Sequence, residues 1–176
     1  MAAEPTRIRN YEGGDVFQIV RLFYETVRSV NRADYSEEQV RTWAPGIPDP
    51  ETWHARMADR RTLVAEGHGG LIGFAELEED GHLDMFYLRK DAVCRGVGSL
   101  LYQAIEREAR EQGIGLIFTE ASVTARPFFE QRGFRVVREQ TVETRGVKPD
   151  ELRDGEDLTP NQRRRGTGRS VGLGPV

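Results

Sequence analysis

The segment from Leu83 to Gln112 constrains the fold of this chain more than any other. The apolar stretch Leu83–Leu88 has the composition of a β-strand, and after a polar interval the chain enters a long amphipathic helix through Gly96-Val97-Gly98. Backbone amides in the first turn of such a helix have no partner within the helix, and together with the helix dipole they attract phosphate oxygens. A plain tight turn into a helix would explain the two glycines equally well. The glycine pattern alone therefore does not identify a phosphate-binding loop, and the rest of the sequence must be considered with it.

The rest of the chain alternates strands and helices. Hydrophobic periodicity predicts strands over residues 6–10, 61–66, 71–79, 82–88, 114–120 and 134–143, and helices over 15–30, 36–44, 50–57, 96–112 and 125–132. The turns at 67–70 and 80–81 contain glycine, as in antiparallel hairpins. The 176 residues suffice for one domain of ordinary size, so this order predicts a single α/β domain of the α+β type.

Cysteine and histidine are too few for a structural metal site. Cys94 is the only cysteine, which excludes an intramolecular disulfide and a four-thiolate zinc site. The three histidines, His54, His68 and His82, show no ligand spacing. We therefore expect no metal.

The balance of acidic and basic residues argues against nucleic acid as the partner of this chain. The formal net charge is −4, and residues 1–145 hold 19 basic and 24 acidic residues, whereas nucleic-acid-binding proteins usually concentrate basic residues on one face. A cationic small substrate suits this balance better. No apolar run approaches the ~18 residues of a membrane span, and the first residues lack the pattern of a secretory signal. We expect a cytoplasmic protein with no nucleic-acid or membrane partner.

Two common nucleotide-binding motifs do not occur in the sequence. The lysine-containing signature Gly-x-x-x-x-Gly-Lys-Ser/Thr is nowhere in the chain. The dinucleotide motif Gly-x-Gly-x-x-Gly would need a third glycine at the position of Leu101, and the strands before it are joined as hairpins. ATP hydrolysis and a nicotinamide-binding fold are both disfavoured.

Together, three features resemble the GNAT superfamily of acetyl-CoA-dependent N-acetyltransferases over residues 6–145. These are the glycine loop, the order of the elements, and a second motif formed by Ser122-Val123-Thr124-Ala125 and Phe128–Phe134. The family's pyrophosphate loop reads Gln/Arg-x-x-Gly-x-Gly/Ala, and Val93 stands at its first position. The resemblance implies a GNAT-like domain over residues 1–146, with a central mixed, mostly antiparallel sheet flanked by helices, and acetyl-CoA as co-substrate.

The resemblance also implies which residues hold acetyl-CoA. Phe86 and Leu88 would offer backbone groups to the pantetheine arm, and the glycine loop would hold the pyrophosphate. The full implied set is Phe86, Leu88, Arg95, Gly96, Val97, Gly98, Ser99, Ser122, Ala125, Phe128 and Phe129. Core packing would explain Phe128 equally well. Many family members have a tyrosine at Phe129 that protonates the leaving thiolate, so here either another donor serves or the thiolate leaves unassisted.

Amine acetylation needs a neutral nitrogen and therefore a base. His82 and Asp84 are two residues apart on a predicted strand, so they share a face with Phe86 and Leu88. Some family members carry their catalytic Glu or His at these positions. We predict His82 as the base, because its pKa is naturally near neutrality, and Asp84 as a group that orients it or attracts a cationic amine. The alternative is a solvated start of an edge strand.

Three further residues are candidates for the acceptor side of the site. Glu76 precedes the turn at 80–81, where a carboxylate could attract a cationic amine. Tyr35 and Trp43 lie on the segment after the first helix, which family members vary to choose substrates. Core packing is the alternative for Trp43.

The end of the chain departs from the family pattern. Residues 147–176 are polar and rich in glycine and arginine, and too few apolar side chains are present to offset the ordering entropy. We predict a flexible tail there, in place of the last strand of the family's sheet. The predicted strand over 134–143 would then keep an unpaired edge, which predicts a homodimer or low stability.

The predicted function is transfer of an acetyl group from acetyl-CoA directly to a primary amine of a small molecule or peptide. A catalytically silent acyl-CoA-binding or regulatory module is the alternative, because Phe129 removes the usual acid. A nucleic-acid binder that uses the arginine-rich tail is a third and weaker interpretation.

Overall fold

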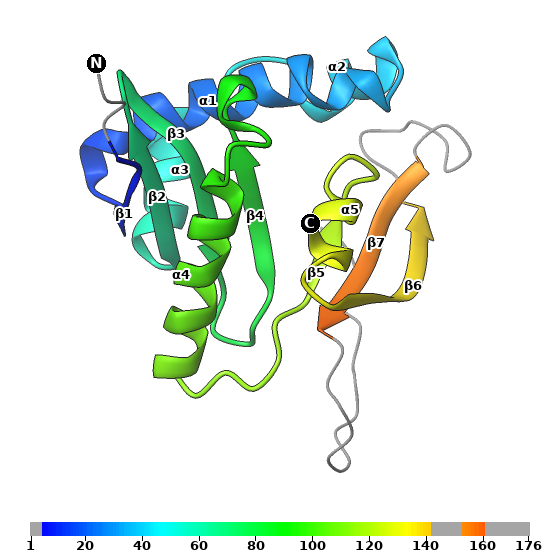
Figure 1. Ribbon diagram of the computed structural model, residues 1–176. Helices are drawn as coiled ribbons and strands as arrows, with labels where there is room; N and C mark the ends of the chain where they lie inside the picture. Colours follow the sequence, from blue (N-terminus) through cyan, green and yellow to red (C-terminus); the bar gives the residue numbers. More distant parts are fainter. Residues whose placement is uncertain (1–4, 142–152, 161–176) are drawn as a thin grey trace.

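The computed structural model describes residues 5–141 and 153–160 of the chain. Its strands form two sheets (Figure 1). The first sheet is antiparallel, and its strands in spatial order are β1 (Arg7–Asn10), β2 (Arg61–Gly67), β3 (Gly70–Leu77) and β4 (Leu83–Leu88). The second is also antiparallel, in the order β5 (Thr119–Ala121), β7 (Arg153–Pro160) and β6 (Phe134–Thr141).

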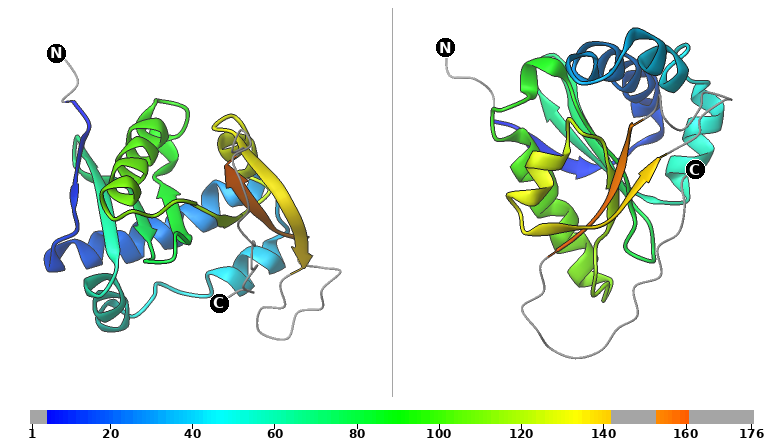
Figure 2. Two further views of the ribbon diagram at one scale, coloured as in Figure 1. Left: turned by 90° about the horizontal axis from the view of Figure 1, so that it is seen from below. Right: turned by 90° about the vertical axis from the view of Figure 1, so that its right-hand side faces the viewer.

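Helices cover both faces of the first sheet (Figure 2). The helices of the described residues are α1 (Val16–Ser29), α2 (Glu37–Trp43), α3 (Pro50–Ala58), α4 (Val97–Glu111) and α5 (Arg126–Glu130), with short 3-10 turns at Gly13–Asp15, Asn31–Ala33 and Lys90–Ala92. Of these, α5 contacts β6 and β7 of the second sheet. On one face, Leu101 and Ile105 of α4 pack in the same cluster as Leu77. On the other, α1 shares a cluster with residues of β2, β3 and α3. Among the described residues no helix is long and apolar enough to cross a membrane.

The helix boundaries follow local signals in the sequence. The Ser36 hydroxyl accepts a hydrogen bond from the Gln39 amide, while the Gln39 side chain accepts one from the Ser36 amide, so α2 begins with a capping box. The Asp49 carboxylate caps α3, and Pro50 occupies the first turn of that helix. The α/β architecture predicted from the sequence is therefore confirmed.

The strand predicted over 114–120 is shorter than expected. Only Thr119–Ala121 forms a strand, because a strand needs a hydrogen-bonded neighbour, and the neighbour of β5 within its sheet is β7. The chain before β5 instead runs close to the β3–β4 turn. A side chain at Gly81 would meet the Leu116 carbonyl oxygen at 2.0 Å, so only glycine fits there.

The end of the chain also differs from the sequence prediction. Residues 153–160, predicted as part of a flexible tail, form β7 between β5 and β6. A central strand is held by backbone hydrogen bonds on both sides, which do not require apolar side chains, so a polar segment can form one. The rest of the predicted tail, 147–152 and 161–176, lies outside the described residues. β6 remains at the edge of its sheet, and dimerisation through it stays a prediction.

A parallel bridge between His82 and Phe118 joins the two sheets. The Leu83 amide donates to the Phe118 carbonyl at 2.8 Å, and the Phe118 amide donates to the Gly81 carbonyl at 3.0 Å. Beyond this point β4 and β5 belong to separate sheets, and Figure 1 shows them diverging. β4 is therefore an edge strand whose outer side faces the space between the sheets.

Candidate functional site

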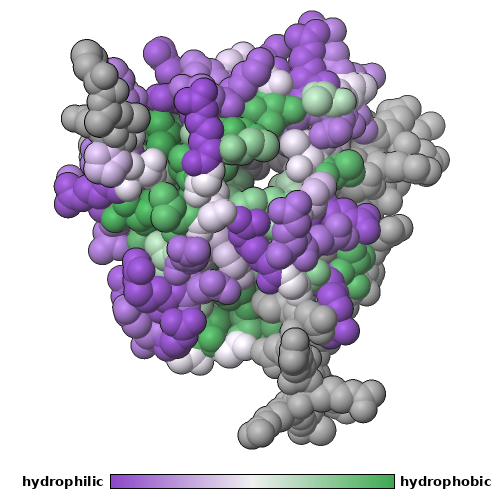
Figure 3. Space-filling model, viewed as in Figure 1, coloured by the Kyte–Doolittle hydropathy of each residue, from purple (hydrophilic) through white to green (hydrophobic). Residues whose placement is uncertain are grey.

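A cleft of about 490 Å³ lies in this space. Its lining comes from β4, the loop before α4, β5 and α5, together with Thr26, Val30, Asn31 and Trp43. In Figure 3 this face of the molecule is hollowed near its middle, where apolar and hydrophilic surface meet. A half-open cleft with both kinds of surface is typical of a small-molecule site.

The glycine loop forms one end of the cleft. Gly96, the residue before α4, has φ of 82°, and Cys94 has φ of 59°. A left-handed cysteine is uncommon, and such strain often marks a functional loop. The amides of the first helical turn have no acceptors within the helix, and a helix start of this kind is suited to binding an anion.

The two glycines of this loop have different roles. A side chain at Gly96 would meet nothing within 4 Å, so its glycine character serves the backbone conformation. At Gly98, a Cβ would meet the Phe128 ring at 2.8 Å and the Leu88 side chain at 3.2 Å. Gly98 therefore allows α4 to approach α5 and β4 closely.

Aromatic rings wall the middle of the cleft. The Phe128 and Phe129 ring centroids lie 5.1 Å apart, and Phe86 of β4 lies 5.1 Å from Phe128 and 5.6 Å from Phe129. Phe129 is 2% exposed and belongs to the hydrophobic core, yet it also lines the cleft. Core packing and cleft wall are therefore not exclusive alternatives for these rings.

Arg132 also lines the cleft, although no motif in the sequence singled it out. Its guanidinium carbon lies 3.4 Å from the centroid of the Phe128 ring. Its nitrogens donate to the Ser99 hydroxyl at 2.5 Å and the Phe128 carbonyl at 2.7 Å, and neither of these partners is a carboxylate. A guanidinium fixed in this way beside the start of α4 is well placed for an anion.

His82 and Glu120 lie where the sheets meet. The His82 Nε2 and Glu120 Oε2 atoms are 2.5 Å apart, and the His82 ring stacks on Phe118 with a centroid distance of 5.1 Å. Burial opposes a charge on His82, but the hydrogen bond to Glu120 and the charges of Glu120, Asp84 and Glu78 outweigh it and raise the pKa of His82. The Glu120 side chain lines the cleft, whereas His82 is not among the lining residues.

A cluster of carboxylates and guanidiniums adjoins this end of the cleft. Glu76 is fully buried, and its Oε1 accepts from Arg56 Nη2 at 2.8 Å and Arg60 Nη1 at 2.6 Å. Asp84, which lines the cleft, accepts from the same two guanidiniums. Although burial opposes the charge on Arg60, its hydrogen bond to Glu76 and the nearby carboxylates raise its pKa. The arginines thus hold both carboxylates in place.

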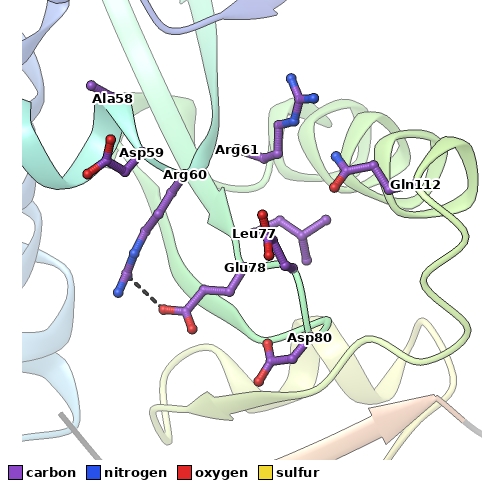
Figure 4. A pocket seen from close by; sticks show the side chains of 9 residues that line it. Ala58, Asp59, Arg60, Arg61, Leu77, Glu78, Asp80 and Gln112 are labelled. Carbon is purple, nitrogen blue, oxygen red and sulfur yellow. Dashed lines mark ion pairs between the residues drawn. The ribbon is translucent and has the colours of Figure 1, made fainter.

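Behind this cluster lies an open groove of about 600 Å³ (Figure 4). Arg60 reaches across it and pairs with Glu78 at 2.7 Å. Glu78, His82 and Asp84 have the donor types of a metal site, and their ligand atoms lie within 4.8 Å of one another. However, the Arg60 guanidinium already contacts both carboxylates, so the positive charge there is supplied by the chain itself.

The structure brings together most of the residues singled out from the sequence. Those that line the cleft are Trp43, Asp84, Phe86, Leu88, Gly96, Gly98, Ser99, Ser122, Ala125, Phe128 and Phe129. The Arg95 side chain is exposed and outside the lining, and Val97 packs in the core. Tyr35 is buried, and its hydroxyl accepts from the Val123 amide at 2.9 Å. Glu76 is fully buried and binds Arg56 and Arg60, so its carboxylate is not exposed for the substrate contact predicted from the sequence.

Residues 31–149 match the family described as "Acetyltransferase (GNAT) domain". The chain is 33% identical over 141 residues to the uncharacterized N-acetyltransferase YafP of Escherichia coli K12, covering 80% of this chain and 89% of that protein. A crystal structure titled as a GCN5-related N-acetyltransferase, "Aminotransferase, Class-II", from Rhodopseudomonas palustris has a TM-score of 0.81 at 31% identity, covering 91% of this chain and 98% of the other. PaiA N-acetyltransferase of Thermoplasma acidophilum, solved with coenzyme A, shares the fold with a TM-score of 0.72 at 18% identity, covering 89% and 98% of the two chains.

Proposed function

This chain belongs to the GNAT acetyltransferase family, and we propose that it transfers the acetyl group of acetyl-CoA directly to a primary amine. Both substrates would occupy the cleft between β4 and β5 at the same time, without a covalent enzyme intermediate. The observation that carries the proposal is the cleft itself. One cleft is lined by a helix start suited to anions, by aromatic rings and, at its other end, by carboxylates.

The described residues fit acetyl-CoA. The first-turn amides of α4, from Val97 to Ser99, and the Arg132 guanidinium would hold the pyrophosphate. β4 is an edge strand, so its outer backbone groups at Phe86 and Leu88 are available to an extended pantetheine arm. The Leu88 carbonyl already accepts from the Thr26 hydroxyl at 2.9 Å, but a carbonyl oxygen has a second lone pair. Bound acetyl-CoA supplies an acyl group activated as a thioester.

The acidic end of the cleft would receive the amine. Asp84 and Glu120 line it, and His82 next to them is our proposed proton acceptor. The Phe129 ring cannot donate a proton. We propose that no acid is needed there. A simple thiol such as that of cysteine has a pKa of about 8.5, so the thiolate of coenzyme A is a good leaving group without protonation.

The charge around this end favours a cationic acceptor. Its carboxylates are Glu76, Glu78, Asp84 and Glu120, and its guanidiniums are Arg56 and Arg60. Carboxylates therefore outnumber guanidiniums, which attracts an ammonium group and lowers the cost of desolvating it. Trp43 in the lining, with Tyr35 against it at a ring distance of 5.5 Å, would form the wall beside the acceptor, a small-molecule or peptide amine.

A pooled-amine screen tests the proposed function. The chain is incubated with acetyl-CoA and pools of diamines, amino sugars and peptides, and mass spectrometry identifies acetylated products while free thiol is measured in parallel. We expect one or more cationic amines to be acetylated, with one coenzyme A released per product. If calorimetry shows that the folded chain binds neither coenzyme A nor acetyl-CoA, the proposal is wrong.

Gly96→Ala is expected to weaken coenzyme A binding about tenfold, equivalent to about 1.4 kcal/mol. Alanine at a φ of 82° is strained by roughly 1–2 kcal/mol, and relaxing that strain moves the amides that face the phosphates. Calorimetric titration with coenzyme A measures the change. Gly113→Ala is the matched control, since Gly113 also has positive φ (73°) and open surroundings but lies at the other end of α4. Equal losses of affinity in both variants would contradict the role of the loop.

A further inference from the structure

Glu120 was not singled out from the sequence, yet it makes the closest contact of His82. Its Oε2 lies 2.5 Å from the His82 Nε2 atom, across the point where β4 and β5 meet. Both side chains are largely buried, with 15% of His82 and 18% of Glu120 exposed. A contact this short between two buried groups fixes the orientation of the ring.

The contact also decides which ring nitrogen of neutral His82 carries the proton. An ionised carboxylate only accepts hydrogen bonds, so the nitrogen that faces Glu120 must donate. Neutral imidazole has a single N–H, and here it is on Nε2. Nδ1 is then left with a free lone pair.

Nδ1 is on the side of the ring that faces Glu78 rather than Glu120. It lies 3.7 Å from Glu78 Oε2, and one ring nitrogen of His82 lies with carboxylate oxygens of Glu78 and Asp84 in a group whose members are within 4.8 Å of one another. Asp84 lines the cleft, so an ammonium group bound to Asp84 would lie next to the His82 ring. Arg60 forms ion pairs with both Glu78 and Asp84 and so holds the two carboxylates in place.

We propose that Glu120 is a positioning residue for acetyl transfer, which holds the Nε2–H of His82 and so presents Nδ1 as the proton acceptor beside Glu78 and Asp84. This inference rests on the proposed function. In the proton transfer, an N–H bond of the acceptor ammonium breaks and the proton binds to Nδ1. The electron pair of that bond stays on the nitrogen, which becomes the nucleophile, and the imidazolium later returns its proton to water.

The charges that face His82 support this role. Glu120 approaches it from β5, Glu78 from the turn after β3 and Asp84 from β4, while Phe118 covers the ring. All three carboxylates stabilise the imidazolium that proton transfer creates. The positive charge of Arg60 opposes this effect, but Arg60 is paired with Glu78 and Asp84. Because the neutral ring is the active form, activity is lost as the pH falls through the raised pKa of His82.

Glu120→Gln tests the inference by kinetics on the full chain, with an amine from the screen and acetyl-CoA. We expect kcat to fall roughly 10²-fold, because the amide can present its NH₂ to Nε2 and favour the wrong tautomer. The acid limb of the kcat/KM profile should move to lower pH, since the carboxylate that favours the imidazolium is gone. Glu130→Gln is the control, because Glu130 is an exposed residue of α5 paired with Arg126. An unchanged kcat and acid limb in Glu120→Gln would overturn the proposal.

Nitrogen NMR of the imidazole rings tests it without any activity. The chain has three histidines, and the spectrum of His82→Ala identifies the His82 signals. We expect the neutral ring of the wild-type chain to be protonated on Nε2, and a ring protonated on Nδ1 would overturn the proposal. The same spectrum is informative even if Glu120→Gln fails to fold or if no amine is acetylated. Failure of this inference is therefore distinguishable from failure of the proposed function.

Discussion

Replacing His82 by alanine is expected to lower kcat for acetyl transfer by about 10²–10⁴-fold near neutral pH, the usual contribution of a general base. Affinity for coenzyme A should change little, because His82 is not among the residues that line the cleft. The His82→Ala loss should shrink toward pH 10, where a growing fraction of the amine is already neutral and needs no base. Steady-state kinetics between pH 6 and 10, with calorimetry for coenzyme binding, measure both effects.

His68→Ala is the control for this experiment. His68 lies in the turn between β2 and β3 and is exposed, so kcat should stay at the wild-type value. A His82→Ala variant that retains wild-type kcat at pH 7 would show that the base lies elsewhere. A loss that is independent of pH would instead indicate a structural role for His82.

Replacing Glu76 by alanine is expected to destabilise the fold by about 3–5 kcal/mol, as removal of one partner of a buried ion pair usually does. Glu76 is fully buried, and it is a shared acceptor for Arg56 and Arg60. Without it, the two guanidiniums keep only the partly exposed Asp84 and Glu78. Chemical denaturation measures the free energy of unfolding, and the melting temperature should fall by about 10 °C.

Glu37→Ala provides the comparison. Glu37 pairs with Arg41 on the surface of α2, with 65% of the arginine side chain and 58% of the glutamate exposed. Such pairs contribute about 0.3–0.5 kcal/mol, so this variant should unfold almost as the wild type does. A Glu76→Ala variant no less stable than Glu37→Ala would mean that the buried cluster contributes nothing to folding.

Local signals in the sequence were sufficient for most of the fold. The capping box at Ser36 and the Asp49-Pro50 pair mark the starts of α2 and α3, and the apolar faces of α1 and α4 have a clear helical period. These features depend on residues that are neighbours in the chain. β7 could not be recognised in the same way, because its place is set by backbone pairing with two strands distant in sequence.

Only those parts of the site whose residues are close together in the sequence could be predicted from it. Strand alternation placed His82 and Asp84 on one face, but the pairing of Leu77 with Leu83 and of Glu76 with Met85 leaves Asp84 as an extra residue in a β-bulge. Asp84 lines the cleft and His82 does not. Glu120 is 38 residues from His82 and reaches it only through the folded structure, so no spacing rule could pair them.

The position of β7 has a consequence for the order in which the protein is made. β1 to β4 and α4 precede residue 112, so the first sheet and the helix that packs on it can assemble while the ribosome is still translating the remainder. β5 and β6 are not neighbours, because β7 lies between them. The second sheet can therefore form only after residues 153–160 have been synthesised. Until then, the nascent chain can hold a folded first sheet while β5 and β6 still lack the strand that pairs with both of them.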